Sequence, residues 1–244
     1  MPAAWRARRD DGPRPTVGDV AARRSAGSSH AGAGSRAPDR TGGGAEPPDS
    51  FRQALASLRS AHLRPEVVLD ETPAPQRLAP YAIALSAEVR QGADDLATGR
   101  LVVLHDPEGQ DAWAGPTRVV GYVRAACEPE MANDPLLPAV GWSWLLEALQ
   151  ARGATFTAAS GTVTRVASES FGALGGGPGS AEVEIRASWS PLDEELGRHL
   201  EGFGDLLCQA GGLPPLPPGV ATLKPRKPAR VTRAPRAKPS PRQR

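Results

Sequence analysis

The stretch VGWSWLLEAL, residues 140–149, holds two of the chain's five tryptophans and a single charged residue, Glu147. On a helix its apolar residues do not form one stripe, and a helix that is apolar on more than one side is buried on more than one side. We predict a helix that begins near Pro138 and ends at Gly153. One side carries Val140, Trp144 and Ala148, and another carries Trp142, Leu145, Leu146 and Leu149.

These tryptophans have two compatible interpretations. In the first, Trp142 and Trp144 are core residues, hidden from water along opposite flanks of one helix. In the second, they form an interface with a second copy or a partner protein, because Trp is enriched at interaction hot spots. The candidate core or interface residues are Trp142, Trp144, Leu145, Leu149 and Trp189.

Composition divides the chain into four parts. Residues 1–49 are rich in Gly, Ala, Pro, Ser and Arg without a sustained apolar period, so they are predicted to be disordered. Residues 50–212 are predicted to form a single α+β domain, a common size for one core. Residues 213–223 form a Pro-rich linker, and residues 224–244 form a basic tail that is predicted to be disordered.

Charge is segregated along the chain, although the net formal charge is only +2. Residues 50–223 carry 12 Arg and 21 acidic residues, whereas residues 224–244 carry nine Lys or Arg and no acid. Such a tail can contact phosphates without reading sequence. It can also act as a solubilising or charge-balancing segment. The candidate phosphate-contacting residues are Lys224, Arg226, Lys227, Arg230, Arg233, Arg236 and Lys238.

The order of periodic segments predicts α-β-β-β-α-β-β-α, a five-stranded antiparallel sheet with three helices on one side. Alternation of apolar and polar residues indicates that one face of each strand is packed and the other is wet. Residues 65–80, PEVVLDETPAPQRLAP, are extended and interrupted by prolines, so any strand there lies at an edge. The predicted strands are residues 81–90, 101–106, 117–127, 155–168 and 181–190.

Helix starts are predicted from capping residues. Ser50 and Gln53 have the spacing of a capping box for the first helix. Ser190, Pro191 and Asp193 predict the start of the last helix. Its apolar face is Leu196, Leu200, Phe203, Leu207 and Ala210.

Two resemblances follow from these segments. Residues 50–223, with NDPLLPAVGWSWLLEAL and DAWAGPTRVVGYVRA as the distinctive stretches, resemble an actinobacterial family of uncharacterised proteins. That resemblance implies a domain of unknown function and assigns no activity. The element order is similar to that of the type III secretion chaperone-like fold, including YbjN-like proteins, and this similarity implies protein binding.

Catalytic and metal-site patterns are weak throughout. The segment HDPEGQD, residues 105–111, is predicted to be a loop between strands, with a metal site as the alternative. LGGGPGS, residues 174–180, lacks the ending of a phosphate-binding loop, and AASGT, residues 158–162, lies within a strand. Cys127 lies beside Glu128, which raises a thiol pKa. No catalytic residue, metal ligand or cofactor is therefore predicted.

The chain has two cysteines without a CxxC pattern and no apolar run of membrane-spanning length. We expect a cytoplasmic protein with no membrane partner. The leading hypothesis is a non-enzymatic protein-binding or chaperone-like adaptor, with a protein partner or a second copy of the chain as its partner. The alternatives are a nucleic-acid-associated accessory protein that uses the basic tail, and a small metal-dependent hydrolase built around His105.

Overall fold

The computed structural model describes residues 46–172 and 179–215, and within them six antiparallel strands form one sheet. The strands lie in the order β1-β2-β3-β4-β6-β5 across the sheet. Their bounds are β1 Val67–Thr72, β2 Tyr81–Gln91, β3 Asp94–Gln110, β4 Gly115–Cys127, β5 Phe156–Ser168 and β6 Ser180–Pro191.

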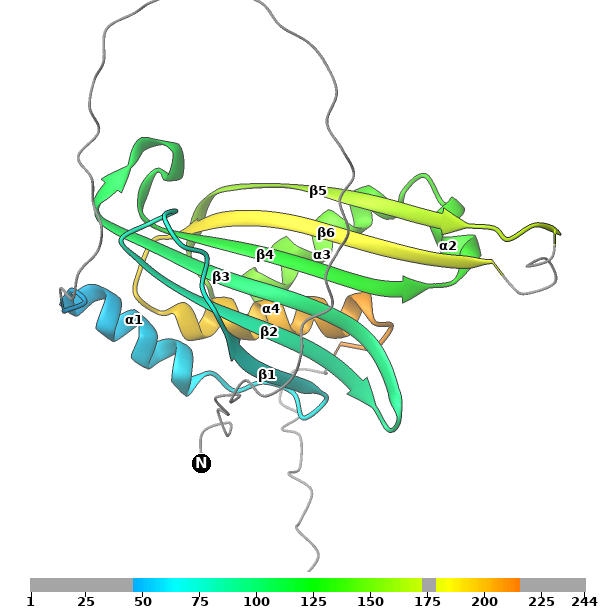
Figure 1. Ribbon diagram of the computed structural model, residues 1–244, viewed down its shortest axis with the longest axis horizontal. Helices are drawn as coiled ribbons and strands as arrows, with labels where there is room; N and C mark the ends of the chain where they lie inside the picture. The colour runs from blue at the N-terminus through cyan, green and yellow to red at the C-terminus, as the bar shows by residue number, and fades with distance from the viewer. Residues whose placement is uncertain (1–45, 173–178, 216–244) are drawn as a thin grey trace, which may run out of the picture.

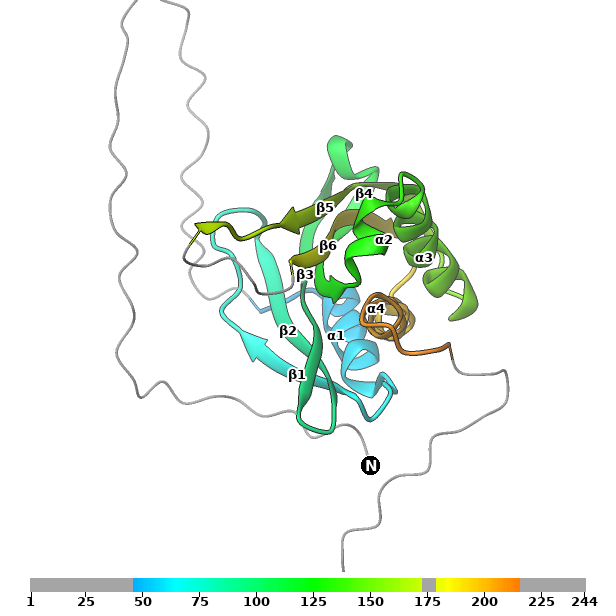
Figure 2. The ribbon, with the colours of Figure 1, turned by 90° about the vertical axis from the view of Figure 1, so that its right-hand side faces the viewer.

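Helices cover one face of this sheet, and we call the opposite face the open face (Figures 1 and 2). The long helices α1, α3 and α4 lie on the covered face, with α4 in the middle. A one-turn 3-10 helix, η1, lies at the tip of the hairpin between β3 and β4. The bounds are α1 Asp49–Ser60, η1 Asp111–Trp113, α2 Pro129–Asn133, α3 Leu137–Ala151 and α4 Leu196–Ala210.

The chain does not fill the sheet in sequence order. Strands β1 to β4 follow one another as antiparallel neighbours. The connection after β4, which contains α2 and α3, then carries the chain to the far edge, where β5 begins. Strand β6 returns between β4 and β5 and pairs with both. The last strand of the chain therefore joins two parts of the sheet.

Alternation along the strands separates the two faces as predicted. In β6, Val183, Ile185 and Trp189 are at most 1% exposed, while the intervening Glu184 and Arg186 lie on the open face. Burial of this apolar surface between sheet and helices is the main driving force for the fold.

Two glycines of the sheet bring α4 close to its centre. A Cβ atom on Gly99 would lie 3.0 Å from the Phe203 ring and 2.8 Å from a Leu207 methyl carbon. A Cβ atom on Gly121 would lie 3.2 Å from the same ring. Phe203 therefore packs where these two strands carry no side chain, and no space is left between helix and sheet.

Glycines on α4 also set its distance from the flanking helices. A Cβ atom on Gly197 would lie 2.6 Å from the carbonyl oxygen of Ser57 in α1. A Cβ atom on Gly202 would lie 3.1 Å from the carbonyl oxygen of Ala148 in α3. Helix α4 is thus held between α1 and α3 with direct backbone contact on both sides.

The predicted α+β class and antiparallel sheet are confirmed, but the predicted counts are wrong. The described residues form six strands rather than five, because Val67–Thr72 pairs with β2. This strand lies at the edge of the sheet, as expected for a segment bounded by prolines. A fourth helix, the five-residue α2, was not predicted because one turn is too short to show a helical period.

Both predicted helix starts are wrong. Helix α1 begins at Asp49 after Pro48, and its cap makes no side-chain hydrogen bond. Ser190 and Pro191 belong to β6, and α4 begins only at Leu196. The strand continues because its residues pair with β5, and this pairing outweighs local capping preference. The predicted apolar face of α4 is confirmed, since all five of its residues are buried.

Candidate functional site

Helix α3 is covered on one side and exposed to solvent on the other. Leu145 and Leu149 are fully buried, as is Trp189 of β6. Trp142 and Trp144 are only half-buried and pack against the edge of the core. The prediction that both tryptophans are hidden from water is therefore wrong, because α3 packs on the edge strand β5, where one side of the helix stays uncovered.

Close packing holds α3 on β5. A Cβ atom on Gly161 of β5 would lie 2.8 Å from the Trp142 ring. A Cβ atom on Gly141 of α3, the residue before Trp142, would lie 3.2 Å from a methyl carbon of Val163 in β5. Trp142 thus helps to fix the helix on its strand.

The uncovered side of α3 carries an apolar stripe, which we call the α3 stripe and define as Leu136, Val140 and Trp144. These residues are four apart, so they lie on one side of the helix. Leu136 is 63% exposed and Val140 is 41% exposed. Between residues 135 and 164 only Glu147 and Arg152 are charged, so this apolar surface lies in the least charged part of an acidic domain.

Strand β5, beside α3, is an edge strand. It pairs with β6 alone among the described strands, and most of its residues are exposed. Its one charged residue, Arg165, donates to the carbonyl oxygens of Ala132 at 3.2 Å and Asp134 at 2.7 Å. That guanidinium therefore joins the strand to the loop before α3. A charged side chain that projects beyond the edge, the usual protection against strand pairing, is missing along β5.

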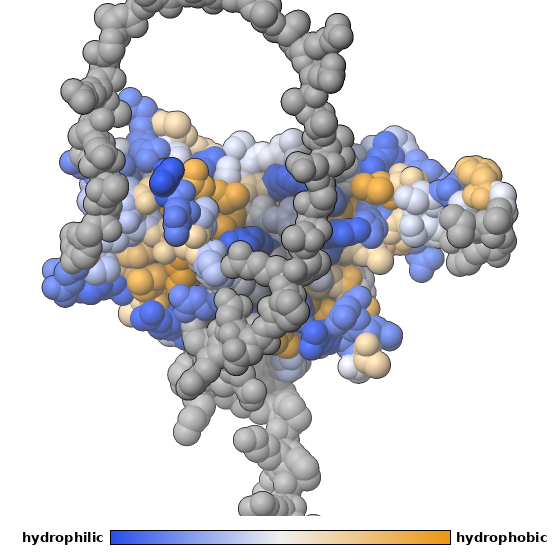
Figure 3. All heavy atoms as spheres, viewed as in Figure 1, coloured by the Kyte–Doolittle hydropathy of each residue, from blue (hydrophilic) through white to orange (hydrophobic). Residues whose placement is uncertain are grey.

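The open face of the sheet is lined with paired charges, and Figure 3 shows hydrophilic and hydrophobic residues mixed across it. Arg124 donates to Glu182 through Nε at 2.8 Å and Nη2 at 2.7 Å. Arg186 lies 2.6 Å from Glu184 and 5.2 Å from the centre of the Tyr122 ring. Each of these arginines has a carboxylate beside it, so the charges offset each other locally.

Arg118 of β4 differs from its neighbours on this face. It is only 8% exposed, and its guanidinium has no ion pair within the described chain. Burial lowers the pKa of the Arg118 guanidinium, yet arginine stays protonated at neutral pH. Its partners are all neutral: the carbonyl oxygen of Ala158 at 2.9 Å and the hydroxyls of Ser188 at 2.7 Å, Ser190 at 3.0 Å and Ser160 at 3.1 Å.

A β-bulge in β5 contributes part of the environment of the Arg118 guanidinium. The register between β5 and β6 shifts between Thr157 and Ser160, and Ala158 adopts a left-handed conformation with φ of 50°. Bulges re-aim backbone and side-chain groups. This bulge contains Ala158 and ends at Ser160. The Ala158 carbonyl and the Ser160 hydroxyl both accept hydrogen bonds from Arg118. The Ser190 hydroxyl in turn donates to the carbonyl of Trp113 in η1. We call Arg118, Ser160, Ser188 and Ser190 the Arg118 cluster.

The loop predicted for residues 105–111 is largely wrong, because β3 extends to Gln110 and η1 begins at Asp111. Asp106 accepts from the backbone N–H of Glu108 and from the side chain of Gln110, both at 3.2 Å. His105 lies on the covered face instead, where Nδ1 is 2.9 Å from the Thr117 hydroxyl and the ring stacks on Phe51. The described chain contains no group of three metal-ligating side chains.

A second buried histidine, His199 of α4, accepts a hydrogen bond at Nδ1 from Nε1 of Trp189 at 3.0 Å. Burial, with a smaller contribution from Arg198, lowers the pKa of His199 to about 4, although Asp193 acts in the opposite direction. The ring is therefore neutral at pH 7 and serves as an acceptor between α4 and the sheet.

Both cysteines are poor nucleophiles. Burial raises the pKa of the Cys208 thiol to about 11. Burial and then Glu128 raise the pKa of Cys127, in the direction predicted from its neighbours. Since the thiolate is the reactive form, neither position favours thiol chemistry.

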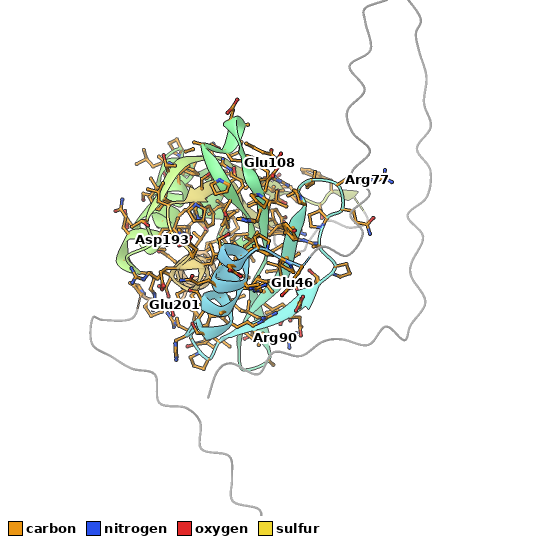
Figure 4. The ribbon with its side chains drawn as sticks, turned by 90° about the vertical axis from the view of Figure 1, so that its left-hand side faces the viewer. Glu46, Arg77, Arg90, Glu108, Asp193 and Glu201 are labelled. Carbon is orange, nitrogen blue, oxygen red and sulfur yellow. The ribbon has the colours of Figure 1, made fainter. Side chains whose placement is uncertain are left out.

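Charged residues of both signs lie on the side of the molecule shown in Figure 4, which labels Glu46, Glu108, Asp193 and Glu201 as well as Arg77 and Arg90. These residues come from separate segments of the chain, and their charges alone define no site.

Other sequence predictions fall outside the described residues. These are most of the segment 1–49 predicted to be disordered, the glycine-rich link at 173–178, and the basic tail with its seven candidate phosphate contacts. Residues 46–49 are described, and Asp49 already belongs to α1. Among the helices that the structure describes, none has the length and apolarity to cross a membrane.

Comparison with known families places the chain. A sequence model of the family described as Protein of unknown function (DUF3000) matches residues 47–221. The chain belongs to this family. The DUF3000 match includes every strand and helix described above, together with the α3 stripe and the Arg118 cluster. The resemblance of residues 50–223 to a domain of unknown function is thereby confirmed. No curated protein and no solved structure matches the chain.

Proposed function

We propose that this DUF3000 chain is a non-enzymatic protein-binding adaptor that acts as a homodimer. The observation that carries the proposal is the α3 stripe. Leu136, the cap residue of α3, is 63% exposed and Val140 in the first turn is 41% exposed, whereas Leu145 and Leu149 of the same helix are fully buried. Exposed apolar patches on a polar surface are typical of protein interaction sites.

The charge distribution favours a second copy of the chain as the occupant. Two acidic domains repel each other over most of their surfaces, and least where both are uncharged. Residues 135–164 hold only two charges, and Arg152 is already paired with Asp205 at 2.6 Å. A two-fold interface brings the same patch of each copy together, so a nearly neutral apolar patch is what it requires.

The edge strand adds a second contribution beside the stripe. Strand β5 offers unpaired backbone groups along one side, and α3 packs directly on this strand. Edge strands of this kind pair with an added strand from another chain. Because β5 and α3 are adjacent, both could contribute to one interface.

The wider adaptor role is supported by element order. Without β1 and the short α2, the order of elements is the one that resembles the type III secretion chaperone-like fold. Members of that fold bind other proteins. The open face, with its row of arginines and carboxylates, would remain available to a partner in such a dimer.

Light scattering coupled to size-exclusion chromatography tests the proposal. The full chain is expected to have twice its 25.5 kDa mass. Val140→Glu places a charge on the stripe without removing a buried side chain, and is expected to give a monomer with unchanged circular dichroism. Leu192→Glu is the matched control, since Leu192 is 63% exposed but lies before α4. A monomeric wild-type chain, or equal effects of both variants, would overturn the proposal.

A further inference from the structure

We propose that Arg118, Ser160 and Ser188 form a binding site for an oxyanion on the open face of the sheet. The site goes beyond the dimer proposed above and is independent of it, since the Arg118 cluster lies on the other face of the sheet from α3.

The first argument is the unpaired charge. Buried charges in proteins are normally paired or bound to a metal, because an isolated charge loses its hydration without compensation. Arg124 and Arg186, on the same face and more exposed, each have a carboxylate within 2.6 Å. Arg118 is the most buried of the three, yet in the described part of the chain it contacts only neutral oxygens. An incoming anion would supply the missing charge.

The second argument is the free hydroxyl hydrogens. Ser160 and Ser188 both accept from Nη2 of Arg118, and their oxygens are 3.4 Å apart. One hydroxyl can donate to the other, so at least one O–H has no acceptor among the described residues. A hydroxyl that accepts from a guanidinium is polarised and becomes a better donor. Ser160 is exposed and Ser188 half-buried, so this donor is accessible from solvent.

The third argument is that the site is already ordered. The bulge at Ala158 sets one side of the guanidinium, and Ser190, itself bonded to the Trp113 carbonyl, sets another. Donors that are fixed before binding do not lose conformational entropy when the ligand arrives. A structural clamp on β5 needs the same contacts, but it does not need an unpaired charge or a spare hydroxyl.

The ligand chemistry follows from these groups. A buried cation and polarised hydroxyls favour a negatively charged acceptor over a neutral one. Phosphoryl and carboxylate groups share this chemistry. The shared property is an oxygen atom that carries negative charge and accepts two or more hydrogen bonds.

Titration of the full chain with inorganic phosphate and, separately, acetate tests the site. Amide chemical shifts of Ala158, Ser160 and Ser188 would be followed at constant ionic strength against chloride. We expect saturable shifts at these residues with at least one oxyanion. Tighter binding of phosphate would identify a phosphoryl ligand, and tighter binding of acetate a carboxylate.

Variants connect the binding to the named groups. Arg118→Met is expected to weaken binding at least about tenfold, because charge-assisted hydrogen bonds are the strong ones. Arg186→Met, which removes a paired arginine from the same face, is the control and is expected to leave affinity unchanged. If Arg118→Met does not fold, the double variant Ser160→Ala, Ser188→Ala keeps the guanidinium and is expected to weaken binding several-fold.

Three results would overturn the site: no saturable shift in the wild-type chain with either anion, equal binding by the Arg118 variant, or equal loss in the Arg186 control. The same titration of Val140→Glu separates the two proposals. A monomeric variant that still binds the anion would show that the anion site does not depend on the dimer.

Discussion

The two faces of the sheet accommodate polar groups in different ways. On the covered face, neutral polar side chains fix the packing, as in the bond between Trp189 and His199. On the open face, the polar side chains are charged, and most charges are paired next to one another. Because neutral groups are tolerated in the core and unpaired charges are not, Arg118, which is buried without a carboxylate partner among the described residues, points to a role other than packing.

Two arginines make the contrast sharper. Arg152 joins α3 to α4 and binds Asp205 at 2.6 and 2.9 Å and Glu201 at 3.3 Å. Arg118 is more deeply buried and has none of these partners. The helix layer thus supplies its own counter-charges, whereas on the open face neither Arg118 nor the exposed Arg100, which donates to the Pro73 carbonyl, has a carboxylate partner among the described residues.

The largest expected effect lies on the covered face. Phe203→Ala removes a ring that is 1% exposed and leaves a cavity above Gly99 and Gly121. We expect the free energy of unfolding to fall by about 3–5 kcal/mol. Urea denaturation at pH 7 would measure it. Val120→Ala, at a 38% exposed position on the open face, serves as the comparison and should change stability by less than about 1 kcal/mol. Equal losses would remove the distinction between the faces.

Acid should act on the covered face through His199. Its pKa is lowered to about 4, so between pH 6.5 and 4 the unfolded chain binds a proton that the folded chain does not. Stability from this group is therefore complete above pH 6.5 and is lost as the pH falls, by about 3 kcal/mol in total. Protonation at Nδ1 would also place two N–H groups against each other at Trp189.

His199→Gln tests whether His199 causes this acid sensitivity. The side-chain oxygen of glutamine can still accept a hydrogen bond from Trp189, but glutamine does not titrate. Urea unfolding at pH 7 and pH 4.5 should show a smaller pH-dependent loss in this variant than in the wild-type chain. An identical loss in both would assign the acid sensitivity to other groups, among them His105, whose pKa burial also lowers.

The smallest expected effects concern the paired arginines. Arg152→Met leaves Asp205 and Glu201, which are 28% and 20% exposed, without their partner. We expect a loss of about 1–2 kcal/mol, below that of a fully buried pair because solvent screens these charges. Arg186→Met, on a side chain that is 56% exposed, should cost less than about 1 kcal/mol. Chemical denaturation at low and high salt would measure the stability loss in each variant. A larger loss for Arg186→Met than for Arg152→Met would contradict this ranking of the two ion pairs.

Much of the covered face could be predicted from sequence, because period and burial coincide there. The spacing of Leu196, Leu200, Phe203, Leu207 and Ala210 predicted the buried side of α4, and alternation in β6 predicted Trp189 as a core residue. Edges were harder. β1 is stabilised by its pairing with β2. Trp142 and Trp144 are half-buried because α3 covers an edge strand. Neither property can be seen in the local periodicity of the sequence.

The Arg118 cluster could not be predicted, because its members come from three strands. Arg118 occupied an ordinary outward position in a strand pattern, and Ser160 was noted only as part of a stretch without a nucleophile elbow. Ser188 and Ser190 reach Arg118 only through the register of β4 with β6, about 70 residues away. The bulge at Ala158 has no sequence signature.

The position of β6 between β4 and β5 has a consequence during synthesis on the ribosome. Until residues 180–191 emerge, β5 has no strand to pair with, and β4 has one open edge. The sheet therefore closes only after β6 has emerged, just before α4 covers its centre. Non-local pairings of this kind form slowly and expose strand edges meanwhile. A nascent chain that stalls before residue 180 would expose one edge of β4 and both edges of β5, so in this interval a ribosome-associated chaperone would matter most.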